Sequence, residues 1–174
     1  MEKADQLRIA IIGPESTGKS EIAKELAHHF EVDFIKEYAR EHLSGKDAYS
    51  FDDVTTIAQE QFKQIERYLH PILIADTELI VTKIWQQFKY EKVDPWIEEH
   101  IKKQHFDIYF LMDIDLEWTF DPMRENPSLK ERKELLAHYQ NELEHQGFNY
   151  QLISGKDIQR TKNALEVIKK LTKG

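Results

Sequence analysis

The stretch IIGPESTGKSE, residues 11–21, decides the fold of this 174-residue chain. It contains the pattern G-x-x-x-x-G-K-[ST], preceded by an apolar run and followed by a helical pattern. In such a loop the glycines let the backbone turn tightly, so that main-chain N–H groups and the helix N-terminus face phosphates. Lys19 adds a positive charge, and the Ser20 hydroxyl can bind Mg²⁺. The residues predicted to bind the phosphates of a nucleotide are Gly13, Glu15, Ser16, Thr17, Gly18, Lys19 and Ser20.

Short apolar runs and helical patterns alternate along the rest of the chain. Apolar periodicity predicts helices between the runs that are long enough to cross over a sheet. The sequence therefore predicts an α/β fold with a mostly parallel five-stranded sheet and helices on both faces, a three-layer sandwich. The five predicted strands are residues 7–13, 32–35, 72–76, 107–113 and 149–153.

Composition limits the possible functions. The length suits one domain, or one domain with a small lid. A formal net charge of -8 argues against a general nucleic-acid binder, because that affinity comes mainly from clustered Lys and Arg. There is no cysteine, and the N-terminal apolar run is far shorter than the roughly 18 residues of a membrane helix. We therefore expect a cytoplasmic protein without a membrane anchor.

Magnesium needs a second protein ligand besides Ser20. Two apolar strands end in an aspartate, ILIAD at Asp76 and IYFLMD at Asp113. We favour Asp76, because Asp113 leads into a long polar loop better suited to a lid. The alternative for either residue is an ordinary aspartate that caps the next turn.

The remaining motifs favour a small-molecule kinase over other proteins with this loop. The N/T-K-x-D motif of GTPases is missing, and a chain this short has little room for an AAA-type motor. A kinase needs a carboxylate near the acceptor and an arginine-bearing lid that excludes water. KEYAR places Glu37 and Arg40 after the second predicted strand, and WTFDPMREN places Arg124 after the fourth.

Several strings together resemble the nicotinamide riboside kinase module of NadR-like NAD-biosynthesis proteins. They are GPESTGKS, EYAR, DTELIVTKIWQQFKY, DIYFLMDIDLEWTFDPMREN and ISGKDIQR, in order along nearly the whole chain. The resemblance implies a single P-loop kinase domain over residues 1–174, strand order 2-3-1-4-5 and a helical lid at about residues 115–130. It also implies ATP and Mg²⁺ as cofactors and nicotinamide riboside as acceptor. Glu78 departs from the family pattern, where we expect D-T-D.

An acceptor with a pyridinium cation calls for aromatic faces and carboxylates. We predict that the acceptor site draws on these two residue types, although each aromatic residue could instead pack in the core. The predicted substrate-binding residues are Glu37, Tyr38, Arg40, Asp76, Trp85, Tyr90, Trp118 and Asp121.

The catalytic roles follow from the same placement. We expect Glu37, or alternatively Asp76, to take the proton of the acceptor hydroxyl. Lys19, Arg124 and Arg40 would stabilise charge on the phosphoryl group. Arg160, in SGKDIQR, is expected to stack on adenine. A kinase for another nucleoside or coenzyme precursor, and a nucleotide-binding regulatory module, remain open, as do the choice between ATP and GTP and the oligomeric state.

Overall fold

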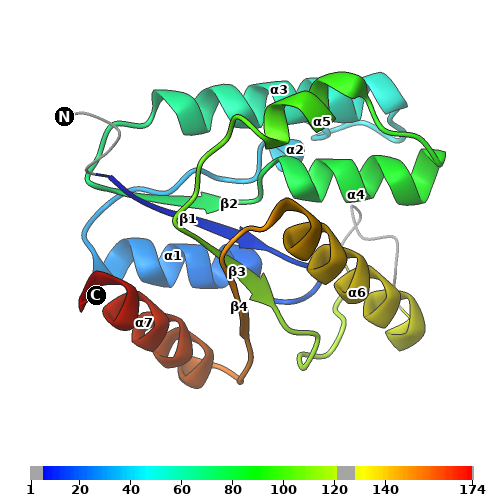
Figure 1. The fold of residues 1–174 in the computed structure, drawn as a ribbon. Helices are drawn as coiled ribbons and strands as arrows, with labels where there is room; N and C mark the ends of the chain where they lie inside the picture. The colour runs from blue at the N-terminus through cyan, green and yellow to red at the C-terminus, as the bar shows by residue number, and fades with distance from the viewer. Residues whose placement is uncertain (1–5, 121–127, 174) are drawn as a thin grey trace.

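A parallel four-stranded sheet forms the centre of the computed structural model, which describes residues 6–120 and 128–173 (Figure 1). Its strands lie in the order β2-β1-β3-β4, and every neighbouring pair is parallel. The prediction of an α/β fold with a parallel sheet is therefore confirmed. The strands are β1 (Leu7–Ile12), β2 (Ile72–Asp76), β3 (Ile108–Met112) and β4 (Tyr150–Ile153).

The prediction of five strands in the order 2-3-1-4-5 is wrong. The predicted second strand, residues 32–35, forms only one isolated bridge, between Ile35 and Ala75. Its other backbone groups bond outside the sheet: the Val32 N–H donates to the Ala27 carbonyl, and the Asp33 carbonyl accepts from the Tyr68 hydroxyl. A ladder cannot extend when neighbouring backbone groups are already engaged elsewhere.

Helices cover both faces of the sheet (Figure 1). One face carries α3 (Phe51–Arg67), α4 (Leu79–Tyr90), α5 (Pro95–Ile101) and α6 (Leu129–Gln146). The opposite face carries α1 (Lys19–His29) and α7 (Ile158–Lys173). A short helix, α2 (Tyr38–His42), packs on α3.

Strand β1 lies inside the sheet and is buried on both faces. Ile9 and Ile11 pack in the core on the α1 and α7 side, whereas Ala10 and Ile12 pack on the α3 to α6 side. Successive strand residues point to opposite faces, so a strand covered by helices on both sides can be apolar at successive positions, as residues 9–12 are. This explains the continuous apolar run that leads into the glycine-rich loop.

Helix starts follow local capping chemistry. Ser50 and Asp53 form a capping box at α3. At α6 the sequence S-x-x-E, residues 128–131, predicts the same motif, and the Ser128 hydroxyl does accept from the Glu131 N–H. Asp94 caps α5, which begins with Pro95. These caps set where α3, α5 and α6 begin relative to the sheet.

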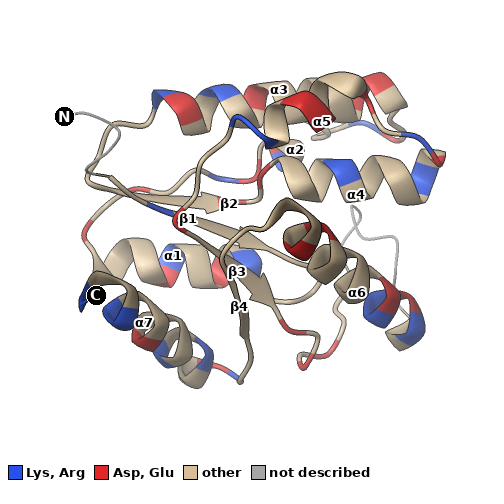
Figure 2. Ribbon diagram, viewed as in Figure 1, with Lys and Arg blue, Asp and Glu red and all other residues tan. Residues whose placement is uncertain are grey.

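Charged residues lie mainly on the helices and loops (Figure 2). Arg8 in β1 is an exception, only 2% exposed. Its guanidinium donates to the His105 carbonyl at 2.6 Å, to Gln6 at 2.8 Å and to Glu66 at 3.1 Å, so the buried charge is compensated. Within residues 6–120 and 128–173, no helix combines the length and apolar character needed to cross a membrane.

Candidate active site

The glycine-rich loop joins the end of β1 to the start of α1. Gly18 is the N-cap of α1, with a positive φ of 77°, and Gly13 has a φ of 139°. A Cβ on Gly13 would lie 3.0 Å from the Met112 carbonyl oxygen at the end of β3. Only glycine fits this conformation and this close approach. The loop is therefore held against the sheet at its first residue.

The loop is also closed by its own side chains. The Lys19 ammonium donates to the carbonyl oxygens of Gly13 and Pro14, at 3.0 and 2.9 Å. The Thr17 hydroxyl donates to the same Pro14 carbonyl at 2.7 Å. The ammonium thus lies over the cradle of the loop, where the phosphates of a nucleotide would bind.

The two predicted magnesium ligands lie together. The Ser20 hydroxyl donates to Asp76 Oδ2 at 2.6 Å. Asp76 is 2% exposed, and burial, with the nearby charge of Glu37, raises its pKa to about 6. Its Oδ1 is buried and makes no hydrogen bond within the described part of the chain. A buried carboxylate oxygen beside a hydroxyl is suited to a hard cation such as Mg²⁺, so these residues fit the ion that the fold implies.

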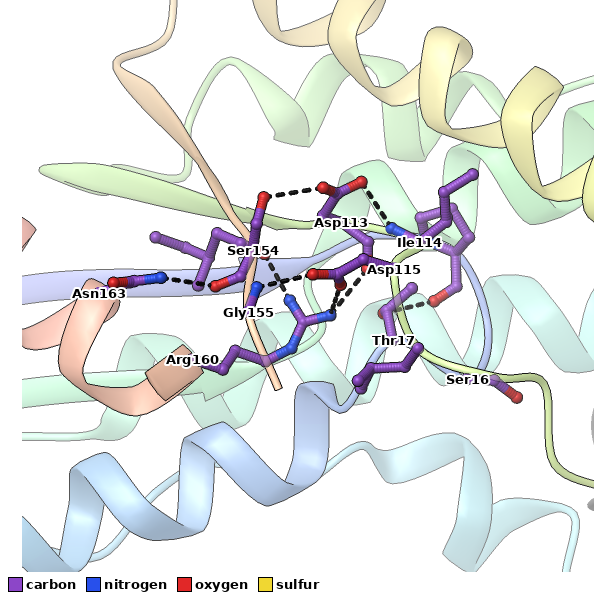
Figure 3. Close-up of polar contacts among 12 residues, drawn as sticks. Ser16, Thr17, Asp113, Ile114, Asp115, Ser154, Gly155, Arg160 and Asn163 are labelled. Carbon is purple, nitrogen blue, oxygen red and sulfur yellow. Dashed lines mark hydrogen bonds and ion pairs between the residues drawn. The ribbon is translucent and has the colours of Figure 1, made fainter. Parts of the chain in front are cut away.

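Asp113, the alternative to Asp76, serves a different purpose (Figure 3). Its Oδ1 accepts from the Ile114 N–H at 2.8 Å, and its Oδ2 accepts from the Ser154 hydroxyl at 2.7 Å. It therefore ties the ends of β3 and β4 together and caps the following turn. The choice of Asp76 as the carboxylate beside Ser20 agrees with this geometry.

A cavity of about 450 Å³ opens directly on the loop. The loop forms one wall, α2 contributes a second and α4 with α6 a third. Its volume falls within the range of small-molecule and cofactor sites. The lining residues outside the loop are Glu21, Glu37, Arg40, Val81, Ile84, Trp85, Phe88, Lys89, Leu135 and Tyr139.

Glu37 and Arg40 form the polar wall of the cavity. Glu37 is the N-cap residue of α2, and its carboxylate lies 3.4 Å from the Arg40 guanidinium. Glu37 also raises the pKa of Asp76, so the charges of the two acids act on each other. Glu37 therefore lines the cavity next to the glycine-rich loop, and its role beside an acceptor stays a prediction.

The apolar wall was only partly foreseen. Trp85 was predicted, and it lines the cavity while its indole N–H donates to the Tyr49 hydroxyl at 2.9 Å. Val81, Ile84 and Phe88 share the same face of α4; their spacing is visible in the sequence but does not distinguish a cavity wall from the core. Tyr139 of α6 was missed; burial raises its pKa well above the ordinary value, so its phenol stays protonated.

Four predicted substrate residues that the structure describes are not among those that line the cavity: Tyr38, Asp76, Tyr90 and Trp118. Tyr38 belongs to α2 and packs, with Ala39 of the same helix, against Ile57 of α3. The Tyr90 hydroxyl donates to the Tyr49 carbonyl at 3.4 Å. The Trp118 ring lies 6.4 Å from that of Phe120, centroid to centroid, in the loop after β3. Asp121 and Arg124 lie outside the described residues.

Arg160 does not have the environment predicted for it (Figure 3). It is 4% exposed, and its guanidinium donates to the Ile153 and Asp113 carbonyls at 2.5 and 2.9 Å. It also pairs with Asp115 at 2.5 Å. A side chain so enclosed has no open face for adenine, which corrects the stacking prediction. Arg160 instead joins the ends of β3 and β4, and its side chain lies next to Gly18.

A second buried arginine, Arg132 of α6, was missed. Its guanidinium donates to the Leu116 carbonyl at 3.1 Å and to the Ser16 carbonyl at 3.3 Å. The Ser16 hydroxyl in turn accepts from the Thr119 N–H at 3.2 Å. These bonds tie the glycine-rich loop to the segment after β3 and to α6. No short motif marks an arginine whose partners are distant main-chain carbonyls.

Glu78, the departure from the family pattern, is not among the residues that line the cavity. It is fully buried; it caps α4 by accepting from the Ile80 N–H at 2.8 Å and also accepts from the Gln104 amide. Burial raises its pKa to about 7. We therefore assign Glu78 to the support of α4.

The fold and the loop together define a P-loop protein with a nucleotide-kinase-like architecture. A family model described as an AAA domain matches residues 8–160, and the chain belongs to this family. The length of the chain predicts little room for an AAA-type motor, yet the family to which it belongs is described as an AAA domain. The curated relatives are biosynthetic and regulatory proteins. The chain is 30% identical over 135 residues to the trifunctional NAD biosynthesis/regulator protein NadR of Escherichia coli K12. That match covers 72% of this chain and 33% of the relative.

Solved structures agree on the fold. A crystal structure of NadR protein in complex with NR superposes with a TM-score of 0.79 at 18% identity, over 98% of this chain and 52% of that one. Deoxyadenosine kinase from M. mycoides with bound dATP gives a TM-score of 0.67 at 16% identity, over 94% of this chain and 100% of that one. The resemblance to NadR-like proteins is thus confirmed, and the chain spans about a third of the curated relatives that it matches.

The Gly13→Ala variant tests the loop. Its methyl group would meet the Met112 carbonyl and its φ would be unfavourable, so we expect the loop to shift and nucleotide affinity to fall roughly 10- to 100-fold. Isothermal titration with Mg-ATP measures this. Gly147→Ala is the control: φ is 69° there with no atom within 4 Å, so only a stability loss of roughly 1 to 2 kcal/mol is expected. Equal ATP affinities in both variants would contradict the loop assignment.

The Glu78→Gln variant tests the buried acid. Because the folded-state pKa of Glu78 is raised from 4.5 to about 7, the folded state holds a proton that the unfolded state releases. The contribution of this proton to the free energy of unfolding is fully present below pH 4.5 and is lost as the pH rises through 7. We expect the variant to match wild type at pH 4 and to exceed it by roughly 3 kcal/mol at pH 8 in urea unfolding. If the unfolding free energies of wild type and variant change in parallel with pH, the raised pKa of Glu78 is wrong. Glu134→Gln, on the exposed side of α6, is the control.

Proposed function

We propose that this chain is a kinase that transfers the γ-phosphoryl group of ATP to the 5'-hydroxyl of nicotinamide riboside. The product would be nicotinamide mononucleotide, a step of NAD salvage. One observation carries the proposal: a single cavity of about 450 Å³ is lined by Lys19 and Ser20 on the donor side and by Glu37 on another wall. The groups that we propose to serve the phosphate donor and the acceptor therefore line one cavity.

The comparisons support this choice of substrate. The curated relative is a NAD biosynthesis/regulator protein, and a NadR protein of the same fold was crystallised with NR. The chain corresponds to about a third of the curated relative, so only part of that protein's activities can be proposed for it.

The donor side follows from the loop. The main-chain N–H groups of the loop and the N-terminus of α1 would bind the phosphates. Lys19 would exchange the Gly13 and Pro14 carbonyls for phosphate oxygens, to which its charge binds more strongly. Ser20 and Asp76 would hold Mg²⁺, which neutralises the charge that develops on the phosphates.

The acceptor side follows from the other walls. Trp85 offers an aromatic ring and Glu37 a carboxylate to a pyridinium riboside. In the transfer, the bond between the γ-phosphorus and the ADP oxygen breaks and a bond to the 5'-oxygen forms. The 5'-hydroxyl proton passes to Glu37, which we prefer to Asp76 because Asp76 already accepts from Ser20. Arg40 would stabilise the phosphoryl charge. The lid at about residues 115–130, with Trp118, Asp121 and Arg124, stays a prediction.

Two other functions follow from the same site. The likeness to deoxyadenosine kinase in fold keeps a different nucleoside acceptor in view. A regulatory module would bind nucleotide without turnover. The test is incubation with Mg-ATP and a panel of riboside and deoxynucleoside acceptors, read by mass spectrometry for the gain of one phosphoryl group. We expect nicotinamide riboside to be phosphorylated. Product only from a deoxynucleoside, or tight ATP binding with no product, would overturn the proposal in favour of one alternative.

The Glu37→Gln variant tests the proposed base. The amide keeps the shape but cannot accept the proton, so we expect kcat to fall about 100-fold with unchanged ATP affinity. Steady-state kinetics with nicotinamide riboside and titration with Mg-ATP measure the two quantities. Glu41→Gln, on the exposed side of the same helix, is the matched control and should behave as wild type. Near-normal turnover in Glu37→Gln would exclude the role.

A further inference from the structure

Gln61 is a buried side chain that holds both acid-bearing segments of the site. It lies on α3, 1% exposed, and is not among the residues that line the cavity. Its Oε1 accepts from the Tyr38 N–H at 2.8 Å. Its Nε2 donates to the Lys36 carbonyl at 3.2 Å. One amide therefore binds the backbone on both sides of Glu37.

The same amide reaches the end of β2. Gln61 Nε2 also lies within hydrogen-bond distance of the Thr77 carbonyl, at 3.2 Å, and of the Asp76 carbonyl, at 3.4 Å. Thr77 has a positive φ of 80°, an unfavourable conformation for a β-branched residue. Such a conformation persists only where surrounding contacts fix it. The Gln61 amide is one of these contacts.

The pairing of the two segments is otherwise slight. Residues 32–35 do not form a strand, and among the described residues their pairing with β2 is the isolated bridge between Ile35 and Ala75. Beyond this bridge the chain turns into α2, and Gln61 fills the gap between the turn and the end of β2. A side-chain amide has the donor and acceptor needed to replace a missing strand ladder at this point.

We propose that Gln61 is a positioning residue for phosphoryl transfer, which sets the spacing between Glu37 and Asp76. This inference rests on the proposed function. Glu37 would face the acceptor hydroxyl, while Asp76 with Ser20 would serve the donor phosphates. Transfer depends on the relative position of the two, and a displacement of about 1 Å can cost about 100-fold in rate. Gln61 fixes that position without touching either substrate.

The test compares two buried glutamines. Gln61→Leu removes the amide, and Gln61→Glu keeps its shape and the acceptor for Tyr38 but, when ionised, loses the donor. The matched control is Gln86→Leu: Gln86 is 0% exposed and bonds Asp94, Thr55 and the Phe51 carbonyl, away from the cavity. Each variant is measured as kcat and KM per mole of folded enzyme, with folded fractions from thermal unfolding.

We expect both Gln61 variants to lose about 10- to 100-fold in kcat while the KM for ATP stays within about twofold of wild type. Gln86→Leu should lose stability but keep its kcat. Hydrogen exchange should rise at residues 36–38 and 76–77 in the Gln61 variants but not in Gln86→Leu.

Two results would overturn the inference. If wild type forms product and the Gln61 variants match Gln86→Leu in kcat, Gln61 supports the fold only, and the kinase assignment stands. If wild type forms no product from any acceptor, the proposed function fails and this inference fails with it. Should Gln61→Leu not fold, Gln61→Glu alone decides between these results.

Discussion

The close contact between Gly13 and the end of β3 is the constraint on which the site depends. A phosphate cradle needs several main-chain N–H groups turned toward one point, and residues with side chains rarely adopt the positive φ values that this requires. Gly13 lies so close to the Met112 carbonyl that a Cβ would not fit between them, and Gly18 is the N-cap of α1. The position of the loop on the sheet is therefore fixed at both ends. Lys19 and Ser20 then follow at determined positions, one over the cradle and one beside Asp76.

The parallel sheet brings the remaining groups to the same edge. The carboxyl ends of parallel strands meet there, and this edge carries the loop after β1, Asp76 at the end of β2 and Asp113 after β3. The structure uses the two aspartates differently. Asp76 is buried, and one of its carboxylate oxygens makes no hydrogen bond among the described residues. Both carboxylate oxygens of Asp113 accept hydrogen bonds, from the Ile114 N–H and the Ser154 hydroxyl. The strand pattern does not encode burial or hydrogen bonding, and these decide which aspartate keeps a carboxylate oxygen available for a ligand.

Sequence patterns predicted what depends on neighbouring residues. Strand β1, the capped start of α6 and the loop with Lys19 follow from periodicity and short motifs, and all are present. Contacts distant in sequence were not predictable in this way. The segment 32–35 has the composition of a strand, but its backbone bonds elsewhere. Arg160 binds the Asp113 carbonyl and Arg132 the Ser16 carbonyl, both far along the chain, so neither the burial of the first nor the presence of the second near the loop could be inferred.

The central claim is that the loop binds a triphosphate beside an acceptor held at Glu37. The most direct measurement is a crystal structure with Mg²⁺, a non-hydrolysable ATP analogue and nicotinamide riboside bound together. We predict that Lys19 leaves the Gly13 and Pro14 carbonyls for the phosphates, and that the 5'-hydroxyl lies within hydrogen-bond distance of Glu37 and in line with the γ-phosphorus. A nucleotide bound elsewhere, or a riboside whose 5'-hydroxyl faces away from both groups, would contradict the account.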